Sequence, residues 1–96
     1  MKLSKINKGF IYLISPNKIK SEDFYLHLAL VLNTRNVSFF QLRLKKENTK
    51  NKLIIGNRIK KICKKYKVKF LINDDPKLAK KINADGCHLG QKDMNI

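Results

Sequence analysis

Four short apolar runs alternate with three stretches of helical spacing along the chain, and this alternation restricts the fold more than any other feature. The runs are FIYLI at 10–14, VSFFQLR at 37–43, VKFLIN at 68–73 and GCHL, which begins a strand at 86. Continuous apolar runs that end in turn residues predict buried strands. Regular alternation with short connections predicts right-handed crossovers and a parallel sheet.

The segments between these runs predict helices. Residues 22–34 follow Ser21, a favourable N-cap residue, and place apolar side chains on one face. The clearest helix covers residues 55–66, where apolar residues fall at i, i+4, i+7, i+8 and i+11. Asp75 and Pro76 then supply an N-cap and a first-turn proline for a short third helix. Four strands and three helices form either a small open sheet or half of an eight-stranded barrel, a fold of about 250 residues.

The net charge of +15 raises the question of nucleic-acid binding, because Lys and Arg neutralise phosphates. The positive residues are almost all Lys, in a chain rich in Asn and Ile, which indicates a chain-wide bias in residue choice. Proteins that read DNA grooves depend on Arg for bidentate base contacts, and only Arg35, Arg43 and Arg58 are present. A nucleic-acid partner is therefore disfavoured, although a positive field still attracts small phosphorylated molecules.

The two cysteines argue against a metal-binding protein, and the apolar run at residues 10–14 argues against a signal peptide or a membrane span. Cys63 and Cys87 match no metal-ligand spacing, so we expect two reduced thiols, one on a helix face and one in a strand. FIYLI is too short for a signal-peptide core or a membrane span. We expect a cytoplasmic protein without a membrane partner.

Polar side chains gather where three of the predicted strands end, and the carboxyl ends of strands carry the site in parallel α/β folds. Alternate residues of a strand face the same way, so several of them can point into one cavity if the second strand continues far enough. Guanidinium and ammonium groups bind phosphate oxygens, and carboxylates bind Mg²⁺. The mixture suits a pyrophosphate bound with a divalent cation, whereas isolated charges at strand ends are often merely solvated. The residues are Gln41, Arg43 and Lys45 after the second strand, Asn73 and Asp74 after the third, and His88, Gln91 and Asp93 in and after the fourth. His88 is either a packed strand histidine or a catalytic group, and His27 is expected to be a surface or half-buried helix residue.

At these positions the chain resembles the thiamine phosphate synthase family, which has thiazole tautomerase-like relatives. IYLIS resembles the family's opening strand, and QLRLKK, LINDD and ADGCHLGQKD resemble its later motifs in the same order. Leu44 and Asp75 depart from the pattern, because the family carries an acid and an Arg there. The resemblance implies a partial TIM (β/α)8 barrel with about the first four strands and three helices. It also implies that residues 1–96 are the N-terminal half of the barrel domain.

The resemblance implies a reaction in thiamine biosynthesis. The family joins hydroxymethylpyrimidine diphosphate to thiazole phosphate, which gives thiamine monophosphate and pyrophosphate. Pyrophosphate is expected to leave first, and the thiazole nitrogen then captures the pyrimidine-stabilised cation. The implied roles are substrate binding by Gln41, Arg43, Lys45 and Asn73, electrostatic catalysis by Arg43 and Lys45, and Mg²⁺ ligation by Asp74 and Asp93.

Family members are about twice as long as this chain, so we expect the 96 residues alone to lack synthase activity. A half barrel exposes two sheet edges, which favours self-association or pairing with a complementary C-terminal half. Two other functions remain open: a thiazole tautomerase-like relative, and a non-catalytic basic protein that binds phosphate or nucleic acid on the same scaffold. The intact QLRLK, Asn-Asp and GQKD groups favour the synthase.

Overall fold

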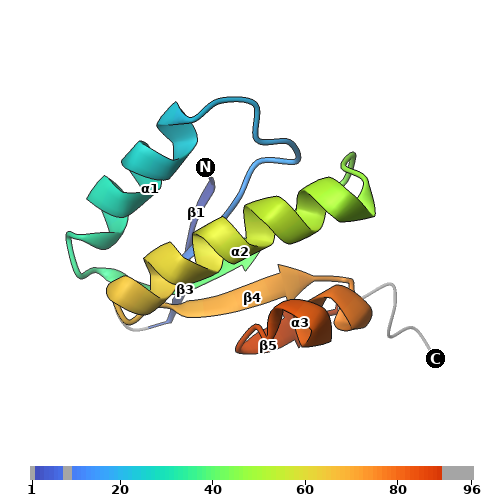
Figure 1. Ribbon diagram of the computed structural model, residues 1–96. Coiled ribbons are helices and arrows are strands. Elements are labelled where there is room, and N and C mark those ends of the chain that lie inside the picture. The colour runs from blue at the N-terminus through green and yellow to red at the C-terminus, as the bar shows by residue number, and fades with distance from the viewer. Residues whose placement is uncertain (1, 8–9, 90–96) are drawn as a thin grey trace.

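The computed structural model describes residues 2–7 and 10–89, which form one layer of strands and one layer of helices (Figure 1). The described strands make a single sheet in the order β1-β2-β3-β4-β5. In chain order the elements are β1 (Lys2–Asn7), β2 (Phe10–Ile14), α1 (Asp23–Leu32), β3 (Val37–Leu42), α2 (Thr49–Lys65), β4 (Lys69–Asn73), α3 (Pro76–Ile82) and β5 (Gly86–His88).

The four predicted strands are confirmed, and β2, β3, β4 and β5 run parallel to one another. In the register, Phe40 of β3 lies opposite Phe70 of β4, and Ile72 of β4 lies opposite Cys87 of β5. One helix connects each successive pair of parallel strands. The α/β alternation read from the sequence therefore holds through the described residues.

Strand β1 was not predicted. It pairs antiparallel with β2, with Leu3 opposite Leu13, and so covers the edge that the sequence analysis left open at residues 10–14. Its sequence, KLSKIN, lacks the continuous apolar run that marks the other strands. Lys-rich strands are common at sheet edges, and this one is defined by pairing with β2 rather than by its own pattern.

The helix boundaries follow local capping. Helix α1 begins at Asp23, and its N-cap residue is Glu22, which makes no side-chain cap hydrogen bond. The predicted Ser21 N-cap is therefore wrong by one residue, although the Ser21 hydroxyl accepts the backbone N–H of Asp23 at 3.0 Å. Helix α2 begins at Thr49 rather than at residue 55, because the Asn48 side chain accepts the Asn51 N–H and caps the helix. The predicted Asp75 cap is confirmed at the start of α3. None of the described helices has the length and apolarity needed to cross a membrane.

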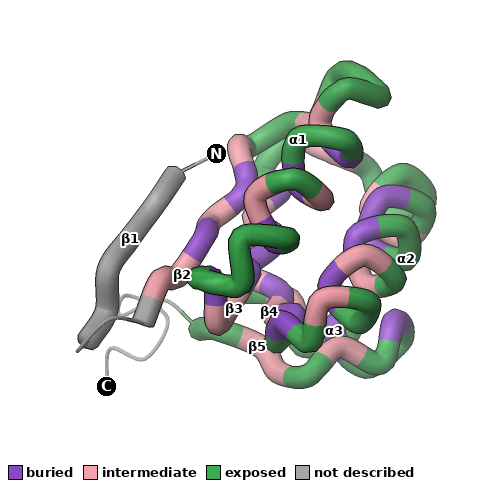
Figure 2. Tube along the Cα trace, turned by 90° about the vertical axis from the view of Figure 1, so that its left-hand side faces the viewer, coloured by how far each residue is buried: buried purple, intermediate pink, exposed green. Residues whose placement is uncertain are grey.

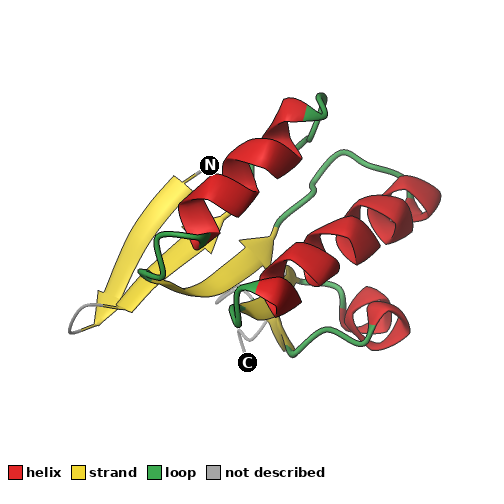
Figure 3. Cartoon of the chain, turned by 60° about the vertical axis from the view of Figure 1, so that its left-hand side comes forward, coloured by secondary structure: helices red, strands yellow, loops and turns green. Residues whose placement is uncertain are grey.

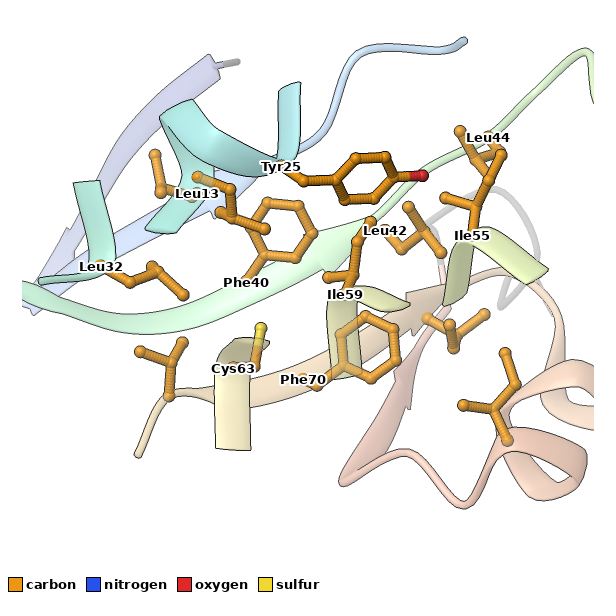
Figure 4. Close-up of a cluster of buried hydrophobic side chains, with 14 of the residues drawn as sticks. Leu13, Tyr25, Leu32, Phe40, Leu42, Leu44, Ile55, Ile59, Cys63 and Phe70 are labelled. Carbon is orange, nitrogen blue, oxygen red and sulfur yellow. The ribbon is translucent and has the colours of Figure 1, made fainter. Parts of the chain in front are cut away.

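The described helices cover one face of the sheet (Figures 2 and 3), and the hydrophobic core lies between the two layers (Figure 4). Phe40 and Phe70 are 0% and 1% exposed and fill the centre of this core. The alternating positions, including Phe39 and Leu71, belong to the opposite face. No described helix covers that face (Figure 2). A parallel sheet with helices on one face corresponds to part of a barrel wall, whose second face turns toward the interior.

Both cysteines are free thiols, as predicted. Cys63 is buried in α2, and burial raises the pKa of its thiol to about 12, with a further contribution from the nearby Asp85 carboxylate. Cys87 is half-buried in β5. His27 is exposed on α1, which agrees with the expected surface position.

Candidate active site at the carboxyl ends of the strands

Ser15 joins the carboxyl ends of β2 and β3. It is 3% exposed, and its backbone N–H donates to the carbonyl of Gln41 at 2.9 Å. Its hydroxyl accepts the backbone N–H of Arg43 at 2.8 Å. The N–H of Lys45 then donates to the carbonyl of Asn17 at 3.2 Å. These bonds hold the segment after β3 against the loop after β2.

The segment that follows β3 keeps the alternation of a strand, although β3 itself ends at Leu42. Leu42 and Leu44 are 2% and 8% exposed and belong to the core. Gln41, Arg43 and Lys45 occupy the alternate positions and therefore belong to the face that the described helices leave uncovered. The structure thus places these three residues on one face at one end of the sheet.

Gln41 is held by a tyrosine that the sequence analysis did not assign to the site. Its side chain is 3% exposed, and its amide nitrogen donates to the hydroxyl of Tyr12 at 2.6 Å. Burial raises the pKa of the Tyr12 phenol, and the hydrogen bond from Gln41 opposes part of that shift. The phenol therefore stays protonated at neutral pH and keeps Gln41 in place.

A second polar contact joins the ends of β3 and β4. The Lys45 ammonium lies 3.6 Å from the Asp74 carboxylate, with 42% and 30% of these side chains exposed. The Asn73 amide donates to the same carboxylate oxygen at 3.3 Å. Two of the three strand ends named by the sequence therefore meet in side-chain contacts.

Asp74 also connects β4 to β5. Its backbone N–H donates to the carbonyl of His88 at 2.8 Å, and its φ of 55° lies in the left-handed region. This region is uncommon for residues with a side chain, but Asp and Asn adopt it more readily than most. His88 is exposed, and it accepts the Asp74 hydrogen bond with its backbone carbonyl and not with its imidazole ring. Three neighbouring strand ends are thus brought together around residue 74.

Of the remaining residues predicted for the site, Arg43 lies in the described part of the chain, whereas Gln91 and Asp93 do not. Arg43 is half-buried, and its guanidinium has no hydrogen-bond or ion-pair partner in the part of the chain that the structure describes. Asp93 and Gln91 lie outside the described residues. Sequence reasoning missed the roles of Tyr12 and Ser15, because both act through contacts with residues that are 28 or 29 positions away.

The described residues include one of the two carboxylates that were predicted to bind Mg²⁺. Within residues 2–7 and 10–89, no group of three His, Cys, Asp or Glu side chains could hold a metal ion. Asp74 is the one predicted carboxylate ligand that falls in this part of the chain. Mg²⁺ usually takes one or two carboxylates and completes its shell with water and phosphate oxygens. The described residues therefore supply one carboxylate, which fits an ion whose shell a phosphorylated substrate completes but not an ion held by described protein groups alone.

Comparison with known proteins agrees with this fold. A family model described as thiamine monophosphate synthase matches residues 11–96. The chain belongs to this family. It is 73% identical over all 96 residues to a thiamine-phosphate synthase of Pelagibacter ubique (strain HTCC1062) and covers 46% of that protein. It is 38% identical over 86 residues to a thiamine-phosphate synthase of Campylobacter jejuni, covering 90% of this chain and 41% of that protein.

A solved structure, a thiamine phosphate pyrophosphorylase from Pyrococcus furiosus, superposes on the chain with a TM-score of 0.69 and 27% sequence identity. The match covers 88% of this chain and 40% of that structure. The chain therefore spans less than half the length of these relatives, and its strands and helices match part of a TIM-barrel synthase structure.

The two departures from the family motifs have structural roles in this chain. Leu44 is 8% exposed and packs in the core, where an apolar side chain is stable. The Asp75 carboxylate accepts the Leu78 N–H at 3.0 Å and lies 3.9 Å from the Lys52 ammonium. Asp75 therefore caps α3 and faces α2, beside the candidate site.

Proposed function

We propose that residues 1–96 are the N-terminal half of a thiamine-phosphate synthase barrel domain. The complete protein would join hydroxymethylpyrimidine diphosphate and thiazole phosphate, with thiamine monophosphate and pyrophosphate as products. The 3.6 Å approach of Lys45 to Asp74, at the strand ends of a chain in this family, is the observation that carries the proposal. In such sheets the carboxyl ends of the strands bind the substrate.

The proposed chemistry needs charge stabilisation at the leaving group. The bond between the pyrimidine methylene carbon and the diphosphate oxygen breaks, and the departing pyrophosphate keeps the electron pair. The thiazole nitrogen then bonds to the methylene carbon, so this step needs no general base. The Arg43 guanidinium and the Lys45 ammonium would stabilise the charge on the pyrophosphate.

The other residues bind and orient the substrate. Gln41 is fixed by Tyr12, so its amide can take part in recognition at little further cost in conformational entropy. Asn73 would bind the same diphosphate substrate from the end of β4. Asp74 and Asp93 would hold Mg²⁺, which supplies Lewis-acid neutralisation of phosphate charge when bound.

The test uses the complete polypeptide that carries this sequence, incubated with both substrates and Mg²⁺. We expect thiamine monophosphate and pyrophosphate to form together. Asp74→Asn should abolish Mg²⁺-dependent turnover, since it removes the carboxylate while Asn still tolerates the left-handed backbone at this residue. Absence of product from a folded protein, or near-normal turnover by Asp74→Asn, would remove the support for the assignment.

Asp75→Asn is the matched control. It also replaces one carboxylate with an amide, at the next residue, and Asn caps helices about as well as Asp. The contact it weakens, with Lys52 at 3.9 Å, is a partly exposed ion pair of small energy. Turnover by this variant should stay close to that of the unmodified protein. An equal loss in both variants would indicate a general effect of charge rather than a metal ligand at Asp74.

A further inference from the structure

A cavity lies at the opposite end of the sheet from the candidate active site. It holds about 380 Å³ and is formed where α2 ends and β4 begins, an end of the sheet visible in Figure 1. Cys63, Val68 and Phe70 form its apolar floor and are all buried. From Lys69 to Asn73, β4 rises by about 13 Å, so the cavity and the candidate active site are separate places on the molecule.

Four lysines line this cavity, and the ammonium groups of three of them make no hydrogen bond or ion pair with the described residues. Lys60 donates to the carbonyl of Ile82 at 2.9 Å and thereby caps the end of α3. Lys64, Lys67 and Lys69 are exposed, and none has a hydrogen-bond or ion-pair partner for its ammonium among residues 2–7 and 10–89. Three unpaired ammonium groups therefore surround one concave surface.

The negative groups near the cavity do not neutralise the positive charge of these three lysines. The Asp85 carboxylate lines the cavity too, but it accepts the backbone N–H of Phe70 at 2.7 Å. The carbonyl groups of the last turn of α2 accept the backbone N–H groups of residues 66–68, so the lysines are not needed to cap that helix. The positive charges of Lys64, Lys67 and Lys69 thus exceed the negative charge of the one carboxylate.

We propose that this cavity binds the phosphate groups of a small phosphorylated molecule. Lys64, Lys67 and Lys69 would contact the phosphate oxygens, and the Asn83 amide can donate a further hydrogen bond. A concave surface ringed by one sign of charge concentrates the field and attracts ligands of the opposite sign. The volume lies in the range of small-molecule sites, which leaves room for an organic part against the apolar floor. The inference does not depend on the proposed synthase function.

The test is a titration of the complete polypeptide with inorganic pyrophosphate, followed by the backbone amide signals in ¹⁵N NMR spectra at 0.15 M salt. Signals of residues 67–70 and 83–85 should shift in a saturable way. Replacing Lys64 and Lys69 together with Gln should weaken this binding by about ten-fold or more, since each charged contact contributes substantially. Replacing both with Arg keeps the charge and should retain binding within about three-fold.

The matched control replaces Lys61 and Lys77 with Gln. These residues are exposed on α2 and α3 outside the cavity, so the net charge falls equally while binding changes less than about two-fold. Equal weakening in both Gln variants would show diffuse charge attraction and overturn the proposal. Shifts confined to residues 43–45 and 73–74, or no saturation, would also overturn it. Loss of the synthase reaction in the Asp74 variant has no bearing on this result.

Discussion

Replacing Tyr12 with Phe removes the hydroxyl that accepts the 2.6 Å hydrogen bond from the Gln41 amide. Gln41 is 3% exposed, so solvent cannot easily replace the lost partner. A buried donor without a partner costs about 1–3 kcal/mol of folding free energy. We therefore expect Tyr12→Phe to lower the free energy of unfolding by that amount, although it deletes a single oxygen atom.

A double-mutant cycle separates this effect from general loss of packing. Gln41→Leu leaves the half-buried Tyr12 hydroxyl without its partner and should cost about 1 kcal/mol. With both changes no buried polar group is left without a hydrogen-bond partner. The free energy of unfolding of the double variant should therefore be higher, by about 1 kcal/mol, than the two single losses added together predict.

The assay is urea unfolding of the complete polypeptide followed by circular dichroism. Tyr66→Phe is the control, since the Tyr66 ring contacts Arg35 and Lys65 but its hydroxyl makes no hydrogen bond within the described chain. That variant should stay within about 0.5 kcal/mol of the unmodified protein. Additive single effects, or a Tyr12→Phe variant as stable as the control, would refute the claim that these two side chains form one unit.

Four further predictions concern a helix cap, the core packing and the two thiols. Asp75→Ala should cost about 1 kcal/mol in urea unfolding, because the α3 cap is lost, whereas Lys77→Ala on the same helix should change stability by less than about 0.5 kcal/mol. Phe40→Ala should cost about 3–5 kcal/mol in the same assay, because Phe40 is 0% exposed in the core; a smaller loss would contradict that packing. A thiol reagent should modify Cys87 in the folded protein but Cys63 only after unfolding. Burial raises the pKa of the Cys63 thiol from 9.0 to about 12, so the folded state favours the protonated thiol. This stabilisation is complete below pH 9 and is lost as the pH rises toward 12. The difference in unfolding free energy between the unmodified protein and Cys63→Ala should therefore shrink from pH 8 to pH 11.

Much of the fold could be predicted from the sequence because it depends on near neighbours. The helical spacing of residues 55–66 and the Asp75–Pro76 pair operate within one or two turns, so each indicates its helix without knowledge of the rest. The parallel sheet followed from the alternation of such elements. The boundaries were less accurate, since the Asn48 cap extends α2 to Thr49, ahead of the apolar pattern.

The candidate site was predicted in outline because parallel strands end at the same edge of their sheet. That rule predicts that residues 41–45 and 73–74 lie together, and the Lys45–Asp74 contact lies where the rule places it. The metal-ligand role of Asp93 stays a prediction, because that residue lies outside the described part of the chain.

The sequence by itself determined the helices, the parallel strands and the end of the sheet at which the polar residues gather. Only the tertiary structure decided that β1 adds an antiparallel edge strand, that Tyr12 holds Gln41, and that Ser15 bonds to Arg43. The physical reason is the range of the interactions. Capping and periodicity act between residues close in the chain, whereas these contacts join groups that become neighbours only when hydrophobic burial folds the sheet against its helices.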